Sequence, residues 1–189
     1  MAAPNALLDL SGHSFAELER FAASDALPPV ESWHPEACGH SGMRIARDGG
    51  WYHEGAPIRR PEMVRLFSRI LRREPDGRYV LVTPAEMLDV DVEDLPFVAV
   101  ELKSSGAGRT RSLGFRLGSG AFVVAGPDHP IRVAAGPEGP LPALHVRAAL
   151  EARIARPVYY ELAEHALEEG ADPPGLWSGG RFFGLDAAE

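Results

Sequence analysis

Arginine side chains are concentrated between residues 44 and 78, next to aromatic residues, and this pattern indicates an anion-binding site. The arginines of this stretch are Arg44, Arg47, Arg59, Arg60, Arg65, Arg69, Arg72, Arg73 and Arg78. A guanidinium presents a planar fork of donors that matches phosphate or carboxylate oxygens, and it is a poor base. Arg44 and Arg60 flank the aromatic pair Trp51-Tyr52, so we take these two arginines as the better candidates for contact with a ligand.

Aromatic residues supply the second component of such a site, because a ring can stack on a base and a tyrosine hydroxyl can hydrogen-bond it. The aromatic candidates are Trp33, Trp51, Tyr52, Phe97, Tyr159 and Tyr160. Most aromatic side chains pack in protein cores, so we expect only a minority of this set to touch a ligand.

Three closely spaced carboxylates indicate a different chemistry. Asp89, Asp91 and Glu93 alternate with Val90 and Val92, so on a strand they share one face, where oxygen ligands can hold a hard cation. A metal-dependent hydrolase that uses these three residues is therefore one hypothesis. The same alternation is typical of a half-buried strand whose valines point inward. We favour this second interpretation, which predicts no metal and no other cofactor.

The remaining side chains that could carry chemistry match no established motif. His34, His40 and His53 lie near Cys38, but their spacings fit no standard zinc or iron site. The chain contains no Gly-x-Ser-x-Gly nucleophile motif, no phosphate-binding loop motif and no complete dinucleotide-binding glycine motif. We therefore predict no catalytic residue and expect a protein that is not an enzyme.

Composition restricts the partners and the location of the protein. The formal net charge of −8 disfavours nucleic-acid polymers, because an acidic chain repels their phosphates. Cys38 is the only cysteine, so no intrachain disulfide can form. No apolar run reaches the roughly 18 residues of a membrane-spanning helix, and MAAPNALLDL lacks the basic start of a signal peptide. We expect a soluble cytoplasmic protein that binds a small molecule and no membrane.

Two helices are predicted in the first half of the chain. Ser14 and Glu17 form a capping-box pattern that predicts a helix over 15–21. Pro61 suits a first helical turn, and the apolar stripe that follows predicts a helix over 61–73. Three arginines lie opposite this stripe, and we expect them to form a solvated face: Arg65, Arg69 and Arg72.

Strand patterns cover much of the remaining chain. Asp48-Gly49 separates 43–47 from Trp51-Tyr52 and predicts a hairpin. Apolar or alternating runs predict further strands at 79–82, 90–92, 97–102, 113–117 and 121–125. A capping pattern at 83–86 predicts a single helical turn. Helical spacing predicts two more helices, 141–155 and 159–169, the second capped by Gly170.

A repeated pattern favours two related β-plus-α units. Residues 51–55 run from an aromatic residue to a glycine and are followed by Pro57-Ile58-Arg59, and residues 122–126 are followed in the same way by Pro130-Ile131-Arg132. The predicted fold class is α+β with duplicated units. The predicted parts are an N-terminal helical extension (1–28), a first α+β subdomain (29–95), a second α+β subdomain (96–170) and a peripheral tail (171–189).

Four blocks of sequence resemble the domain of unknown function 1285 family of bacterial proteins, over most of residues 29–168. In order, these blocks are ESWHPEACGHSGMRIARDGGWYHEGAPIRR, MVRLFSRILRREPDGRYVLVTPAEM, VEDLPFVAV and HVRAALEARIARPVYYELAEHAL. The resemblance implies a duplicated α+β core whose C-terminal half is superficially like a pleckstrin-homology barrel. It also implies a cleft between the halves for a nucleotide-like ligand, a role in signal transduction or stress response, and no established enzymatic activity.

The resemblance also implies a set of ligand-binding residues, which lie within the matching blocks. They are Trp33, Arg44, Trp51, Arg60, Glu93, Asp94, Phe97 and Tyr160. The leading hypothesis is thus a protein that binds a small, nucleotide-like ligand. The alternatives are the metal-dependent hydrolase that uses Asp89, Asp91 and Glu93, and an adaptor that binds another protein through its pleckstrin-like half.

Overall fold

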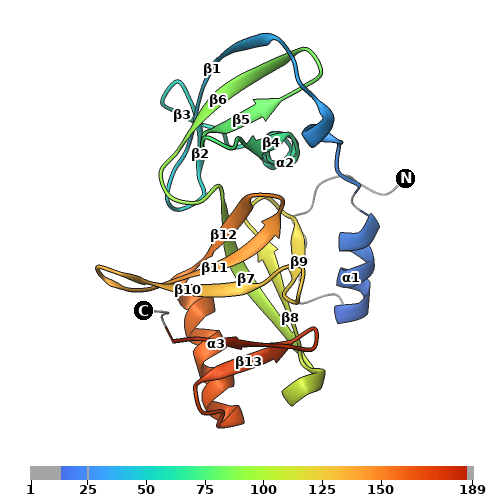
Figure 1. Ribbon diagram of the computed structural model, residues 1–189, viewed down its shortest axis with the longest axis vertical. Helices are drawn as coiled ribbons and strands as arrows, with labels where there is room; N and C mark the ends of the chain where they lie inside the picture. The colour runs from blue at the N-terminus through green and yellow to red at the C-terminus, as the bar shows by residue number, and fades with distance from the viewer. Residues whose placement is uncertain (1–13, 25, 187–189) are drawn as a thin grey trace. The chain divides into compact units, whose positions relative to one another are not determined.

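The structure is a computed structural model that describes residues 14–24 and 26–186 (Figure 1). The described chain divides into two compact units. Residues 26–96 form the first unit, and residues 14–24 together with 97–186 form the second. The boundary between Pro96 and Phe97 lies one residue from the predicted start of the second subdomain.

The first unit is built on a mixed six-stranded sheet, in the order β3-β2-β1-β6-β5-β4. Its strands are β1 (Ala37–Ile45), β2 (Trp51–His53), β3 (Ala56–Pro57), β4 (Leu71–Arg73), β5 (Tyr79–Val82) and β6 (Glu86–Val92). The central strands β1 and β6 are parallel, and every other neighbouring pair is antiparallel. The hairpin predicted at Asp48-Gly49 is confirmed, and it joins β1 to β2.

One face of this sheet is apolar and carries helix α2 (Pro61–Arg69). The strand alternation buries Met43, Ile45 and Val90 on that face. Trp51 of β2 stacks on Phe67 of α2, with ring centroids 6.0 Å apart. Burial of these side chains supplies the main stabilisation of the unit, at about 25 cal/mol for each Å² removed from water.

The helix predicted over 61–73 is too long, because the chain leaves the helical region at Ile70 (φ −102°, ψ 7°). Leu71 then pairs with Leu81 in the sheet, so pairing between distant segments overrides local helical spacing here. The single helical turn predicted at 83–86 is also wrong. Instead, the Thr83 hydroxyl accepts a hydrogen bond from the Glu86 N–H (3.1 Å), and β6 begins at Glu86.

The early end of α2 places Arg72 on β4, where it is 7% exposed and not on a solvated helix face. Its Nη1 donates to the carbonyls of Val30 (2.7 Å) and Trp33 (2.8 Å), and its Nε donates to Glu74 (2.5 Å). Val30 belongs to the short helix η1 (Val30–Ser32). The guanidinium therefore anchors this segment to the sheet, and the hydrogen bonds offset the cost of burying its charge.

The second unit is built on another mixed six-stranded sheet, in the order β10-β11-β12-β7-β8-β9, which curls into a half-barrel (Figure 1). Its strands are β7 (Phe97–Ser105), β8 (Ser112–Leu117), β9 (Phe122–Val124), β10 (Ile131–Gly136), β11 (Gly139–Arg147) and β12 (Leu150–Ile154). The predicted strands near 97–102, 113–117 and 121–125 are confirmed. The central strands β7 and β12 are parallel.

The two sheets share one strand order, which agrees with the prediction of two related units. Each sheet consists of two groups of three antiparallel strands, which we call triplets. The first strand of the first triplet lies parallel to the last strand of the second triplet. The helix content differs between the units. In the first unit α2 separates the two triplets, whereas in the second unit α3 (Arg156–Glu169) follows the last strand.

The second sheet is covered by helices and by a hairpin. The predicted helix near 159–169 is confirmed as α3, and Gly170 caps it with φ 62°. Helix α1 (Phe15–Ser24) contacts β9 through Phe15, whose ring meets Phe122 edge-on at 6.1 Å. The capping box that begins α1 is confirmed, because the Ser14 N–H donates to the Glu17 carboxylate (2.8 Å).

Two predictions for the second unit are wrong. Residues 141–155 form β11 and β12 and no helix, because their apolar residues alternate with polar ones along a central ladder. Residues 171–186, the described part of the predicted peripheral tail, are not simply peripheral. They contain β13 (Gly175–Ser178) and β14 (Arg181–Gly184), a hairpin that buries Leu176 and Phe183. The hydroxyl of Ser178 bridges the Leu113 N–H and the Ala125 carbonyl, which fixes the hairpin to the sheet.

A second buried arginine, Arg111, anchors the loop that holds helix η2 (Gly108–Thr110). Arg111 donates to Glu169 at the end of α3 (2.9 Å), and the Gly108 N–H donates to the same carboxylate (2.8 Å). Burial raises the pKa of Glu169, but these hydrogen bonds and the charge of Arg111 outweigh that effect and lower the pKa overall. Each unit thus uses one buried arginine to anchor a loop.

Replacing Arg72 with methionine should destabilise the first unit by about 3–5 kcal/mol, because it leaves two carbonyls and the Glu74 carboxylate without their donor. The free energy of unfolding from urea denaturation measures this effect. The matched control is Arg73→Met on the same strand. Arg73 is exposed and lies 5.5 Å from the Tyr79 ring, so its loss should cost less than about 1 kcal/mol. Equal costs for the two variants would contradict the anchoring role.

Gly114 of β8 should not tolerate a side chain, because the Phe122 ring of β9 lies directly over its backbone and an added Cβ would overlap that ring. Gly114→Ala should therefore destabilise the second unit by about 1–3 kcal/mol. Gly184→Ala on β14 is the control, since no atom lies within 4 Å of its added Cβ. Thermal unfolding of the two variants compares them, and a neutral Gly114→Ala would contradict the packing described.

Candidate site on the open face of the first sheet

The face of the first sheet opposite its apolar face carries polar side chains, and the strand register determines which of them meet. Arg44 on β1 lies beside Tyr52 on β2 and beside Asp91 on β6. Residues paired across neighbouring strands point to the same side of a sheet. The alternation that buries Met43 and Ile45 therefore turns Arg44 to this open face.

Arg44 makes two contacts that fix its guanidinium. Its Cζ lies 4.3 Å from the centroid of the Tyr52 ring, in a cation–π arrangement. Its Nη1 donates to the Glu93 carboxylate, just beyond the end of β6. Both partners of this ion pair are partly open to solvent, with side chains 39% and 43% exposed. Arg44 is thus oriented and accessible at the same time.

Glu93 is held as a carboxylate at the centre of this group. The Arg47 N–H donates to it (3.0 Å), and this bond, followed by the bond from Arg44, lowers the pKa of the Glu93 carboxyl below its usual range. The Glu93 N–H in turn donates to the Ile45 carbonyl (3.0 Å), which ties the start of the loop after β6 to the end of β1.

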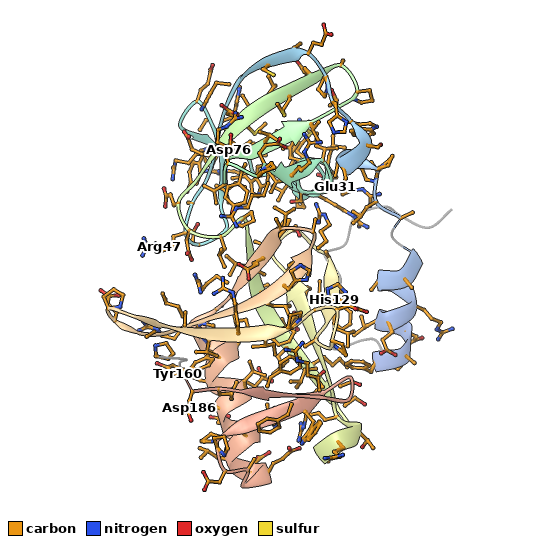
Figure 2. All side chains as sticks on the ribbon, viewed as in Figure 1. Glu31, Arg47, Asp76, His129, Tyr160 and Asp186 are labelled. Carbon is orange, nitrogen blue, oxygen red and sulfur yellow. The ribbon has the colours of Figure 1, made fainter. Side chains whose placement is uncertain are left out.

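The β1–β2 turn positions the remaining parts of the site. Gly49 has φ 85°, which the turn requires, and Asp48 accepts a hydrogen bond from the Gly50 N–H (2.9 Å). An added Cβ at Gly50 would come within 3.2 Å of the Tyr52 ring. The Arg47 side chain projects from this turn (Figure 2). The charge of Arg47, like that of Arg44, lowers the pKa of Glu93.

The carboxylates of Asp89 and Asp91 lie farther along the same face, and each has a cationic or titratable neighbour. Asp89 accepts from Arg78 (2.7 Å), and Asp91 lies 3.7 Å from the His40 ring nitrogen Nε2. In the part of the chain that the structure describes, no group of three or more His, Cys, Asp or Glu side chains could hold a metal ion. The arrangement therefore gives no support to the metal-dependent hydrolase.

Of the aromatic residues predicted for the site, two are buried in their own units and a third is half-buried. Trp51 is 4% exposed and packs in the core of the first unit. Trp33 is half-buried, and its carbonyl accepts a hydrogen bond from Arg72. Phe97 is 3% exposed in the second unit, where the Arg147 guanidinium lies 5.4 Å from its ring.

The other predicted residues occupy different positions. Arg60 is exposed at the N-cap of α2, and Asp94 is half-buried just after Glu93. Tyr160 is 57% exposed on α3. Of the eight predicted residues, the structure brings Arg44 and Glu93 into direct contact. The predicted set omitted Tyr52 and Arg47, and the pairing of Tyr52 with Arg44 follows from the observed register of β1 and β2.

Comparisons with known proteins match both units. The model of the DUF1285 N-terminal domain, a domain of unknown function, covers residues 28–95, and the model of the DUF1285 C-terminal domain covers residues 96–185. The chain belongs to the DUF1285 family. A crystal structure of a DUF1285 protein from Silicibacter pomeroyi DSS-3 is 42% identical, with a TM-score of 0.76, over 90% of this chain and 95% of that chain.

A second crystal structure shares the DUF1285 fold at lower identity. The DUF1285 protein from Shewanella baltica OS155 is 22% identical, with a TM-score of 0.52, over 65% of this chain and 91% of that chain. No protein with curated annotation matches this DUF1285 chain. None of the helices in the described residues is long and apolar enough to cross a membrane.

The low pKa of Glu93 predicts a pH-dependent contribution to stability. A carboxyl whose pKa is lower in the folded state stabilises the protein above its unfolded pKa, and this contribution disappears as the pH falls through the folded pKa. Glu93→Gln should therefore lower the midpoint of thermal unfolding at neutral pH, and the difference from the wild type should vanish in acid. A difference that is constant across this pH range would contradict the lowered pKa.

Proposed function

We propose that this chain is a non-catalytic protein that binds a small, anionic, nucleotide-like ligand at the Arg44–Tyr52 site. The observation that carries the proposal is the half-exposed Arg44 guanidinium, held over the Tyr52 ring and oriented by Glu93. A phosphate or carboxylate is the natural partner of such a preoriented fork.

The contacts of Arg44 leave room for a ligand. Within the described residues, Nη1 of Arg44 donates to Glu93, so the N–H groups of its Nε and Nη2 can donate hydrogen bonds to a bound anion. Arg47 projects from the adjacent turn and supplies a second guanidinium. Because Glu93 stays ionised, it holds Arg44 in place before the ligand arrives, which reduces the entropy cost of binding.

The family resemblance adds a cellular role to this proposal. We propose a cytoplasmic role in signal transduction or stress response, in which the ligand is a small molecule and not a nucleic-acid polymer. We also propose that the C-terminal half-barrel is superficially like a pleckstrin-homology barrel.

Isothermal titration calorimetry of the full chain against mononucleotides, cyclic nucleotides and dinucleotide messengers tests the proposal. At least one of these ligands should bind. Arg44→Ala should weaken its affinity at least about tenfold, since a hydrogen bond to a charged group contributes about 1.5–3 kcal/mol.

The matched control for this experiment is Arg109→Ala. Arg109 is an exposed arginine of the second unit that lies 4.5 Å from the Trp177 ring, so the variant removes the same chemistry at a different place. Its affinity should equal that of the wild type. If no nucleotide of the panel binds, or if both variants lose affinity equally, the proposed site is wrong.

A further inference from the structure

Strands β10 and β11 continue beyond the sheet as a two-stranded arm (Figure 1). The β10–β11 ladder runs from Ile131–Leu144 to Gly136–Gly139, whereas β12 pairs with β11 only from Ala143 onward. Residues 134–141 therefore pair only with each other, and we call them the arm. An isolated two-stranded ribbon is at best marginally stable in water, so the arm lacks the third strand that would stabilise it.

The arm is also unusually apolar for an exposed segment. Its sequence is Ala-Ala-Gly-Pro-Glu-Gly-Pro-Leu, with Glu138 as its one charged residue. Residues 137–141 and Ala135 are all exposed, and Leu141 is 38% exposed. Short exposed ribbons usually carry several charges, which block association, and this arm does not.

The two edges of the arm differ in their capacity to pair. The His145 N–H donates to the Pro130 carbonyl (2.9 Å), which sets the alternation of the antiparallel ladder. By that alternation the backbone nitrogens of Pro140 and Pro142 face away from β10. Proline has no N–H to donate, so the β11 edge of the arm is blocked.

The β10 edge has no such block. By the same alternation Ile131, Val133 and Ala135 direct their N–H and C=O groups away from β11. None of the three is a proline, and β10 is the outermost strand of its sheet. Strand β14 approaches β10, but the described residues form no ladder between these two strands.

We infer that the β10 edge pairs antiparallel with the β10 edge of a second copy of this chain, about a two-fold axis at Ala134. In this register Val133 of each copy lies opposite Ala135 of the other, so the outward backbone groups of both strands meet and form hydrogen bonds. Each arm gains a third and a fourth strand.

Charge complementarity supports a second copy of the chain as the partner of the β10 edge. The same register sets Arg132 opposite Gly136 of the other copy, so no like charges meet. Glu138, the arm's single charge, lies in the turn just beyond Gly136, and so comes near Arg132 of the second copy. Arg132 is exposed and already donates to Glu151 (2.6 Å), and a guanidinium carries enough N–H donors to bind a second carboxylate. The symmetry forms this contact twice.

Light scattering after gel filtration of the full chain should give twice the chain mass of 20.4 kDa. Ala135→Pro should give the monomer mass, because it removes an outward N–H and leaves the ladder to β11 intact. Ala135→Ser keeps the N–H at the same position and should remain a dimer. Thermal unfolding checks that both variants are folded. A monomeric wild type, or a dimer that survives Ala135→Pro, would overturn the inference.

A crosslinking experiment tests the register independently. Residue 134 forms a non-hydrogen-bonded pair with its own symmetry mate, where cross-strand Cα atoms lie about 4.5 Å apart, within reach of a disulfide. In a Cys38→Ser background, Ala134→Cys should form a disulfide-linked dimer under mild oxidation. Ala135→Cys, which faces Val133 of the other copy, should crosslink much more slowly. Equal rates, or no crosslink from Ala134→Cys, would overturn the register.

Discussion

Parallel pairing at the centre of each sheet is the constraint on which this structure depends. β1 lies against β6 and β7 lies against β12, so the first strand of six always meets the last. Parallel neighbours cannot be joined by a tight turn, and here four other strands form the connection. The pairing brings Arg44 next to Glu93, although 49 positions separate them in the sequence. Without it, neither the candidate site nor the core of the unit would form.

The two buried arginines have the same role in both units. Arg72 holds the segment before β1, and Arg111 holds the loop between β7 and β8, through backbone carbonyls and carboxylates. Both residues are 7% exposed, so each ion pair depends on a complete set of hydrogen bonds. This arrangement makes loop position sensitive to single polar contacts.

The parts of the fold that sequence predicted are those with local signals. The capping box at Ser14, the Asp48-Gly49 hairpin and the left-handed cap at Gly170 each depend on residues within a few positions. The predicted helix over 141–155 failed because Leu150 and Ile154 also fit helical spacing, although together with Ala152 they have the period of two that is typical of a strand. The error at Arg72 has the same origin, since only the ladder to β5 ends the helix.

The candidate site was predictable to a similar extent. Arginine density and aromatic neighbours indicated Arg44, and strand alternation placed the carboxylates on one face. The contact between Arg44 and Glu93 depends on the parallel register of β1 and β6, which no local pattern encodes. Trp51 and Phe97 are buried, which their place in a matching block did not indicate, because an aromatic residue in such a block is as readily a core residue.

In the described residues, the second unit is assembled from two separate stretches of the chain, with residues 26–96 of the first unit between them. During synthesis, the first unit has all of its strands once Val92 has emerged from the ribosome, so it can fold early. Helix α1 emerges before that, yet its partner strand β9 is made about a hundred residues later. The apolar side of α1 must therefore wait, exposed or chaperoned, until translation has passed Val124.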